Sequence, residues 1–170
     1  MTADEVKKLL NLAPLPGEGG WFIRTYESPE RIPATAFTDA RYPSPRATGT
    51  AIFYFLEPDT FSEIHRLRSD EIFHFYLGDP VEMLQLHPDG RSERLILGSD
   101  LVAGHQVQQV VPRAVWQGSR LLSGGQWALM GCTVSPGFEY EDYDSILAEP
   151  LIARWPEWTE LITALTREER

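Results

Sequence analysis

Cysteine is nearly missing from this chain of 170 residues, which has Cys132 alone and therefore cannot form an internal disulfide. No apolar run approaches the roughly 20 residues that a helix needs to cross a bilayer, so we expect no membrane partner. The N-terminus also lacks the basic and then apolar pattern of a secretory signal. These absences together predict a cytoplasmic protein.

Basic residues are also few, because 15 Lys and Arg stand against 25 Asp and Glu, for a formal net charge of −10. The basic residues are scattered along the chain, and an acidic surface of this kind repels phosphate backbones, so nucleic acid is not an expected partner. Hydrophobic residues make up 42% of the chain, which is ordinary for a globular protein. A chain of this length can bury a core of its own in a single domain.

Short runs of strand-forming residues follow one another from residue 50 onward, with turns and no helices between them. Turn residues such as Asp79-Pro80 and Asp89-Gly90 separate the runs. This pattern is typical of an antiparallel sandwich or barrel, and we expect an all-β jelly roll. The expected strands cover residues 50–56, 61–67, 71–77, 81–87, 92–97, 106–111, 114–122 and 126–134.

The two ends of the chain carry helical patterns. Thr2 and Glu5 form a capping box that predicts a short helix ending near Asn11, and the apolar spacing after Pro156 predicts a C-terminal helix packed outside the sheets. Residues 21–26 are rich in strand formers, and the proline-rich stretch 28–48 predicts a long loop or edge arm. The expected single domain, residues 1–170, therefore comprises a helix and edge arm (1–48), a barrel (49–140) and a helical tail (141–170).

The most informative segment is residues 60–78, which contains His65, a short polar turn and Glu71. Side chains alternate between the faces of a strand, and the turn at residues 68–70 lets Glu71 return beside His65. Two ionisable groups that meet on the concave face of a barrel form a site for proton transfer or metal binding. A plain cross-strand ion pair is the alternative interpretation.

The same segment resembles the first motif of the cupin superfamily, in which His65, Glu71 and Gly78 stand in register while Leu67 replaces a second His. The second cupin motif corresponds to Pro112 through Gln117, with Gln117 in place of a His. Further stretches resemble the fifth cupin subfamily, namely residues 18–22, 70–76, 111–117 and 131–138. This resemblance implies a cupin jelly roll, or double-stranded β-helix, that forms homodimers and whose biochemical role is largely unassigned.

The resemblance also bears on cofactors, since a typical cupin metal site offers three His and one Glu. Only His65 and Glu71 remain here, with the weak neutral ligand Gln117 beside them. We therefore expect no cofactor. A divalent metal, if one is bound, would be held by these three residues.

A metal-free use of His65 is as a general base, with Glu71 as the group that orients the ring. Sugar-nucleotide 3,5-epimerases share the fold and place a His base opposite a Tyr acid, which by analogy points to Tyr140 as the acid. Tyr140 could equally be a rim or core aromatic. Arg24 could bind an anionic ligand or form a solvated surface ion pair.

The barrel interior is expected to form an apolar cavity with a few polar anchors. Strand parity directs His74 away from this interior. The expected lining and ligand-binding residues are Phe53 or Tyr54, Phe73, Phe75, Gln108, Gln117 and Trp127.

These observations predict a homodimer that binds a small polar organic ligand, sugar-like or carboxylated, and that could act as a metal-independent isomerase or epimerase. A non-catalytic binding or sensing module and a metal-dependent oxygenase or lyase are the alternatives. Trp21, Ile72, Tyr76 and Trp116 could form an outward apolar patch that serves as the dimer interface or is covered by the N-terminal arm.

Overall fold

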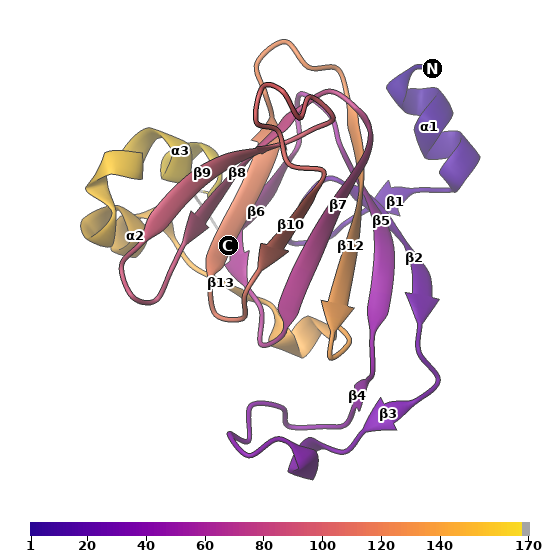
Figure 1. The fold of residues 1–170 in the computed structure, drawn as a ribbon, viewed down its shortest axis with the longest axis vertical. Helices are drawn as coiled ribbons and strands as arrows, with labels where there is room; N and C mark the ends of the chain where they lie inside the picture. Colours follow the sequence, from indigo (N-terminus) through magenta and orange to yellow (C-terminus); the bar gives the residue numbers. More distant parts are fainter. Residues whose placement is uncertain (168–170) are drawn as a thin grey trace.

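Two antiparallel sheets, packed face to face, form the body of the molecule (Figure 1). The computed structural model describes residues 1–167. The six-stranded sheet has the order β1-β2-β5-β12-β7-β10 and the five-stranded sheet the order β13-β6-β11-β8-β9. From β5 onward most consecutive strands therefore lie in different sheets, and most neighbours within a sheet are distant in sequence. The predicted all-β jelly roll is confirmed.

The strand bounds follow the predicted pattern closely from residue 50 onward. The six-stranded sheet contains β1 (Ala13–Pro14), β2 (Trp21–Glu27), β5 (Thr50–Leu56), β7 (Asp70–Gly78), β10 (Gln108–Val111) and β12 (Ala128–Ser135). The five-stranded sheet contains β6 (Phe61–Arg66), β8 (Val81–Leu86), β9 (Ser92–Leu97), β11 (Trp116–Leu121) and β13 (Asp144–Ser145). Because β2 and β13 belong to the sheets, the barrel extends beyond residues 49–140 on both sides.

Helices cover the outer faces of the sheets at the two ends of the chain. The capping box of α1 (Ala3–Leu10) joins Thr2 and Glu5 as predicted, and the helix ends at Asn11 in the left-handed conformation. The C-terminal tail contains α2 (Ala148–Arg154), a 3₁₀ turn (Pro156–Trp158) and α3 (Thr159–Ala164). Within residues 1–167, no helix has the length and apolar character of a membrane-spanning segment.

The predicted edge arm forms a long excursion away from the sheets (Figure 1). It contains a small ladder of β3 (Arg31–Ile32) with β4 (Arg46–Ala47), and a 3₁₀ turn (Ala34–Ala36) lies between these strands. A further 3₁₀ turn (Tyr140–Asp142) follows β12 and packs against the arm through Arg46.

Apolar side chains pack in three layers. The central layer, between the sheets, includes Tyr54, Phe73, Met83 and Met130. A second layer joins the outer face of the five-stranded sheet to the C-terminal helices, and a third joins the outer face of the six-stranded sheet to α1.

The expected apolar patch is not a single surface. Trp116 is buried beneath the C-terminal helices, while Trp21 packs beneath α1, where the Lys7 ammonium lies 4.4 Å from its ring centroid. Ile72 and Tyr76 remain on the outer face of β7, where Tyr76 is half exposed. The expectation that these four side chains share one patch is therefore wrong.

Candidate functional site

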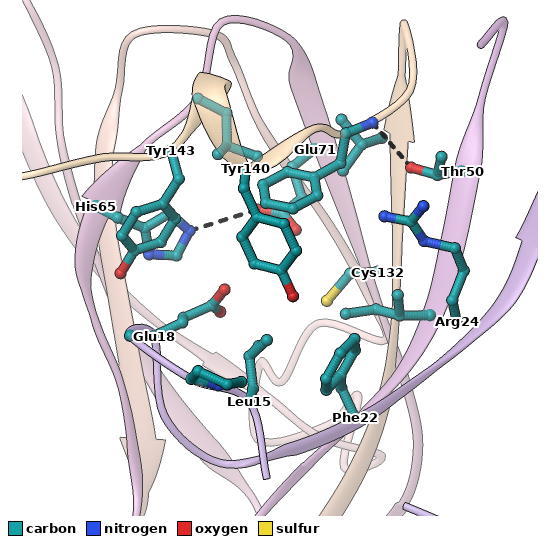
Figure 2. A pocket seen from close by; sticks show the side chains of 16 residues that line it. Leu15, Glu18, Phe22, Arg24, Thr50, His65, Glu71, Cys132, Tyr140 and Tyr143 are labelled. Carbon is teal, nitrogen blue, oxygen red and sulfur yellow. Dashed lines mark hydrogen bonds and ion pairs between the residues drawn. The ribbon is translucent and has the colours of Figure 1, made fainter. Parts of the chain in front are cut away.

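A cavity of about 200 Å³ opens between the two sheets, at the end of the barrel near the Tyr140–Asp142 turn (Figure 2). Its walls come from both sheets and from the loop before β2, and they are mostly apolar with a few polar groups, as in small-molecule sites. The lining residues are Leu15, Pro16, Gly17, Glu18, Phe22, Arg24, Thr50, Ile52, His65, Leu67, Glu71, Cys132, Val134, Phe138, Tyr140 and Tyr143.

His65, on β6, borders this cavity with both ring nitrogens hydrogen-bonded. Nδ1 lies 2.7 Å from the backbone oxygen of Glu63, and Nε2 lies 2.7 Å from Nε2 of Gln117. A carbonyl can only accept, so in the neutral ring Nδ1 carries the proton and Nε2 accepts from the Gln117 amide. The Glu63 carbonyl, together with the stacked ring of Tyr143, therefore orients the imidazole. The expectation that Glu71 does so is wrong.

Gln117, on β11, connects His65 with Glu71. Its Nε2 also donates to Oε2 of Glu71 at 3.2 Å, whereas Nε2 of His65 lies 4.0 Å from that oxygen. His65 is 1% exposed and Glu71 is 7% exposed, so the two groups converge inside the barrel, as the sequence predicted. They do so through the Gln117 amide and not as a direct ion pair.

Glu71 is the most strongly perturbed acid of the cavity. Burial raises its pKa well above the ordinary value, and the nearby Glu18 carboxylate adds to the effect, while a hydrogen bond with Cys132 opposes it. Burial likewise raises the pKa of the Cys132 thiol. The environment thus favours the protonated carboxyl, which can donate a hydrogen bond to a ligand.

Glu18 is a cavity residue that the sequence reasoning missed. It lies in the loop before β2, where its backbone oxygen accepts from the Glu63 amide at 2.9 Å and its side chain accepts from the Ser62 hydroxyl at 3.0 Å. Its carboxylate faces the cavity (Figure 2). The signal was present in the Glu18-Gly19-Gly20 stretch, which carried part of the family resemblance but was not given a role.

Tyr140 and Arg24 border the cavity at its rim, and both are partly exposed to solvent. The Tyr140 ring meets Phe138 edge to face, with centroids 5.3 Å apart. The Arg24 guanidinium is paired with Glu27 at 2.7 Å. The structure therefore places both residues where a ligand could touch them, although Arg24 already has an anionic partner.

Phe73 and Phe75 do not line the cavity, contrary to expectation. They share the inward face of β7 with Glu71, as parity predicted, but they lie deeper in the barrel, where they fill the core between the sheets. Tyr54, on β5, also belongs to this core and does not line the cavity. Residues on one strand face thus divide between cavity wall and packed core according to depth.

Gln108 and Trp127 are placed wrongly by the sequence reasoning. Gln108 is exposed on the outer face of the six-stranded sheet, where its amide lies 3.2 Å from Nδ1 of His74. Trp127 stacks on Phe55 beneath α1. The prediction that His74 points away from the interior is correct, and it pairs with Gln108 in the ladder.

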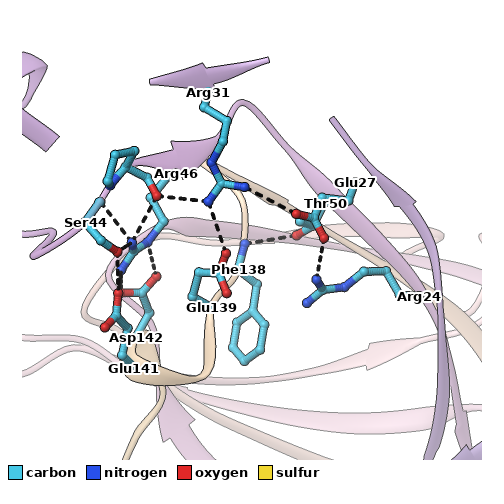
Figure 3. A network of polar contacts seen from close by, with 11 residues as sticks. Arg24, Glu27, Arg31, Ser44, Arg46, Thr50, Phe138, Glu139, Glu141 and Asp142 are labelled. Carbon is cyan, nitrogen blue, oxygen red and sulfur yellow. Dashed lines mark hydrogen bonds and ion pairs between the residues drawn. The ribbon is translucent and has the colours of Figure 1, made fainter. Parts of the chain in front are cut away.

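The cavity wall next to Tyr140 is held by a buried ion pair (Figure 3). Arg46, from the edge arm, donates to both carboxylate oxygens of Asp142, at 2.9 and 2.8 Å, and to Glu141 at 2.6 Å. The side chains of Arg46 and Asp142 are 0% and 2% exposed. Because Asp142 lies between two lining residues, Tyr140 and Tyr143, this pair fixes the wall that closes the cavity.

The residues at the cavity fit a metal ion poorly. Within residues 1–167, no three His, Cys, Asp or Glu side chains gather as a metal-binding group. The Nε2 lone pair of His65 is used by Gln117, and Leu67 contributes hydrocarbon where a second imidazole would be needed. A transition metal would find one engaged imidazole, and the carboxyls of Glu18 and Glu71 and the Cys132 thiol do not gather with it into the usual ligand set.

Comparison with known proteins places the chain in a family. The sequence model of the family described as the cupin superfamily (DUF985) matches residues 4–146. The chain belongs to this family. The chain is similar to the uncharacterised protein YML079W of Saccharomyces cerevisiae. The two are 29% identical over 140 residues, which cover 78% of this chain and 69% of that protein.

Solved structures support the same assignment. Protein SO0799 of Shewanella oneidensis has a TM-score of 0.86 and 31% identity, with 99% of both chains covered. A hypothetical protein of Leishmania major has a TM-score of 0.86 and 27% identity, with 99% of this chain and 100% of that chain covered. Oxalate decarboxylase of Bacillus subtilis matches at a TM-score of 0.54 and 13% identity, over 94% of this chain and 39% of that one, which shows a shared fold alone.

Proposed function

We propose that this cupin binds a small organic molecule in the barrel cavity and recognises it through Glu71. The observation that carries the proposal is the cavity of about 200 Å³ with a buried, hydrogen-bonded Glu71 in its wall. An engineered apolar cavity of about 150 Å³ holds benzene, so a molecule of one ring or similar size fits here. The Glu71 carboxyl would fix its orientation by a hydrogen bond.

A second candidate function is proton transfer, as in a metal-independent isomerase or epimerase. It is favoured by the raised pKa of Glu71, because a carboxyl poised in its protonated form can serve as an acid or, once ionised, as a base. His65 remains a candidate base in this proposal, but its Nε2 accepts from Gln117, so the amide would have to move before the ring took a proton from a ligand. Tyr140 at the rim would be the opposing acid.

Metal-dependent oxygenase or lyase chemistry is the weakest of the three candidate classes. One of the solved structures with a similar fold is oxalate decarboxylase of Bacillus subtilis, a protein with Mn(II) centres. The cavity of this chain offers too few ligands for that chemistry, because Leu67 is apolar and the ring of His65 is engaged by Gln117.

Native mass spectrometry of protein purified from its own cells tests the binding proposal. We expect a retained organic molecule that is lost in a variant with the cavity filled, Cys132→Phe, and kept in the control His74→Asn on the outer sheet face. Recovery of the molecule with unchanged mass after incubation, and without deuterium uptake in D₂O, would favour a binding or sensing module over an isomerase. A protein that retains nothing and is stabilised by no small molecule would refute the proposal.

We also propose that the protein is a cytoplasmic homodimer. The single cysteine supports the compartment, and the outer face of β7 and β10 supports the dimer because Tyr76 and Val110 are 48% and 46% exposed there. Light scattering of the purified protein would give the oligomeric state. A Tyr76→Glu variant should then run as a monomer.

A further inference from the structure

The cavity contains two acidic side chains without a basic partner. Within the part of the chain that the structure describes, neither Glu18 nor Glu71 forms an ion pair with Lys or Arg. The nearest ring nitrogen to Glu71, Nε2 of His65, is 4.0 Å away and accepts a hydrogen bond from Gln117. Glu71 is buried and Glu18 is partly buried. Buried acids usually have a cationic partner, so a cationic ligand would favour the ionised form of Glu71 and pair with both acids.

Two neighbouring carboxylates, by contrast, each lie within ion-pair distance of an arginine. Glu63 lies beside the cavity and is approached by the Arg167 guanidinium at 3.8 Å. Glu27, at the rim, accepts from Arg24 at 2.7 Å. Because Arg24 is the only Lys or Arg among the lining residues and is already paired, the cavity has more acidic than free basic side chains.

The remaining walls suit a cation as well. Aromatic side chains surround the two acids, from β2 on one side and from the segment after β12 on the other (Figure 2). Ring faces attract ammonium groups, and the attraction is stronger where water is excluded. The aromatic lining residues are Phe22, Phe138, Tyr140 and Tyr143.

We propose that the ligand of this cavity is a small organic cation, such as a primary amine, whose ammonium group lies between Glu18 and Glu71. The inference rests on the proposed binding function and names the chemical class of its ligand. It replaces the carboxylated ligand expected from the sequence, because a carboxylate would meet two acids and only a rim arginine that is already bound. The hydrocarbon part of the amine would contact the aromatic walls.

Calorimetric titration with three probes of one size and shape tests the proposal: benzylammonium, benzyl alcohol and benzoate, at neutral pH and equal ionic strength. We expect benzylammonium to bind about tenfold more tightly than the alcohol, and benzoate to bind most weakly. Glu18→Gln and Glu71→Gln keep the shape of the site and remove one acid each. Each should weaken ammonium binding about tenfold while changing alcohol binding by less than about twofold.

Glu93→Gln is the matched control, since it removes an equal charge from an exposed position on β9 beside His87, far from the lining residues. It should leave all three affinities unchanged. Equal or tighter binding of the alcohol or of benzoate would overturn the cation proposal and leave cavity binding intact. If none of the probes binds, the cation proposal also fails, and native mass spectrometry then decides separately whether any molecule occupies the cavity.

Discussion

Replacing Arg46 should destabilise the protein more than any surface charge substitution. In Arg46→Met the Asp142 carboxylate, 2% exposed, loses the two hydrogen bonds that compensate for its burial. Breaking a buried pair in this way costs about 3–5 kcal/mol of unfolding free energy. The Arg68 Nε lies 3.8 Å from Asp142 and can recover part of the interaction, so we expect about 3 kcal/mol, near the lower end of that range.

Urea unfolding followed by tryptophan fluorescence measures this loss, with an unchanged m-value as the sign that the folded state keeps its compactness. The double variant Arg46→Met with Asp142→Asn should recover at least about 1 kcal/mol, because it removes the stranded charge. Arg91→Met is the control, since its pair with Asp89 is exposed and should be worth less than about 1 kcal/mol. A loss below about 1 kcal/mol in Arg46→Met, or no recovery in the double variant, would refute the reasoning.

Four further measurements follow from the same contacts. Burial raises the pKa of Glu71 above its ordinary 4.5, so ionisation favours the unfolded chain. Wild type should therefore lose stability relative to Glu71→Gln as pH rises above that value in urea titrations, whereas the difference between the two should not change with pH below it. Phe73→Ala should lose about 3–5 kcal/mol in urea unfolding, because Phe73 is fully buried. EDTA should leave Tm unchanged in scanning calorimetry, and stoichiometric metal in elemental analysis would contradict this. Gly19→Ala should weaken binding of the retained ligand in calorimetry, whereas Gly124→Ala, which also has positive φ, meets no neighbour and lies outside the cavity lining, should not.

Strand parity predicted the faces of β7 correctly but not the depth of its residues. Glu71, Phe73 and Phe75 all point inward, yet only Glu71 reaches the cavity, because the other two lie where β8 and β9 close the barrel with apolar side chains. A period of two residues distinguishes inside from outside. It carries no information on where along a barrel the filling stops, which depends on side chains from strands far away in sequence.

The error at Gln108 has a different cause, namely register. Gln108 is the cross-strand partner of His74, and directly opposed residues in an antiparallel pair point to the same face. The correct prediction that His74 faces outward would have placed Gln108 outside as well, had the pairing been known. Register between β7 and β10 depends on the long connection between them, and a shift of one residue inverts every side chain.

The glycines before β2 explain how Glu18 reaches the cavity and why the sequence signal was incomplete. Gly19 and Gly20 both have positive φ, and a Cβ on Gly20 would lie 2.8 Å from the Phe55 carbonyl oxygen, while one on Gly19 would collide with the Phe61 carbonyl. Only glycine permits so close an approach of the loop to β5 and β6. A glycine pair therefore indicates close backbone contact, but it does not say which neighbouring side chain the contact positions. In this protein the positioned side chain is Glu18, which lines the same cavity as Glu71. The acidic character of the cavity therefore depends in part on a loop residue that no strand pattern includes.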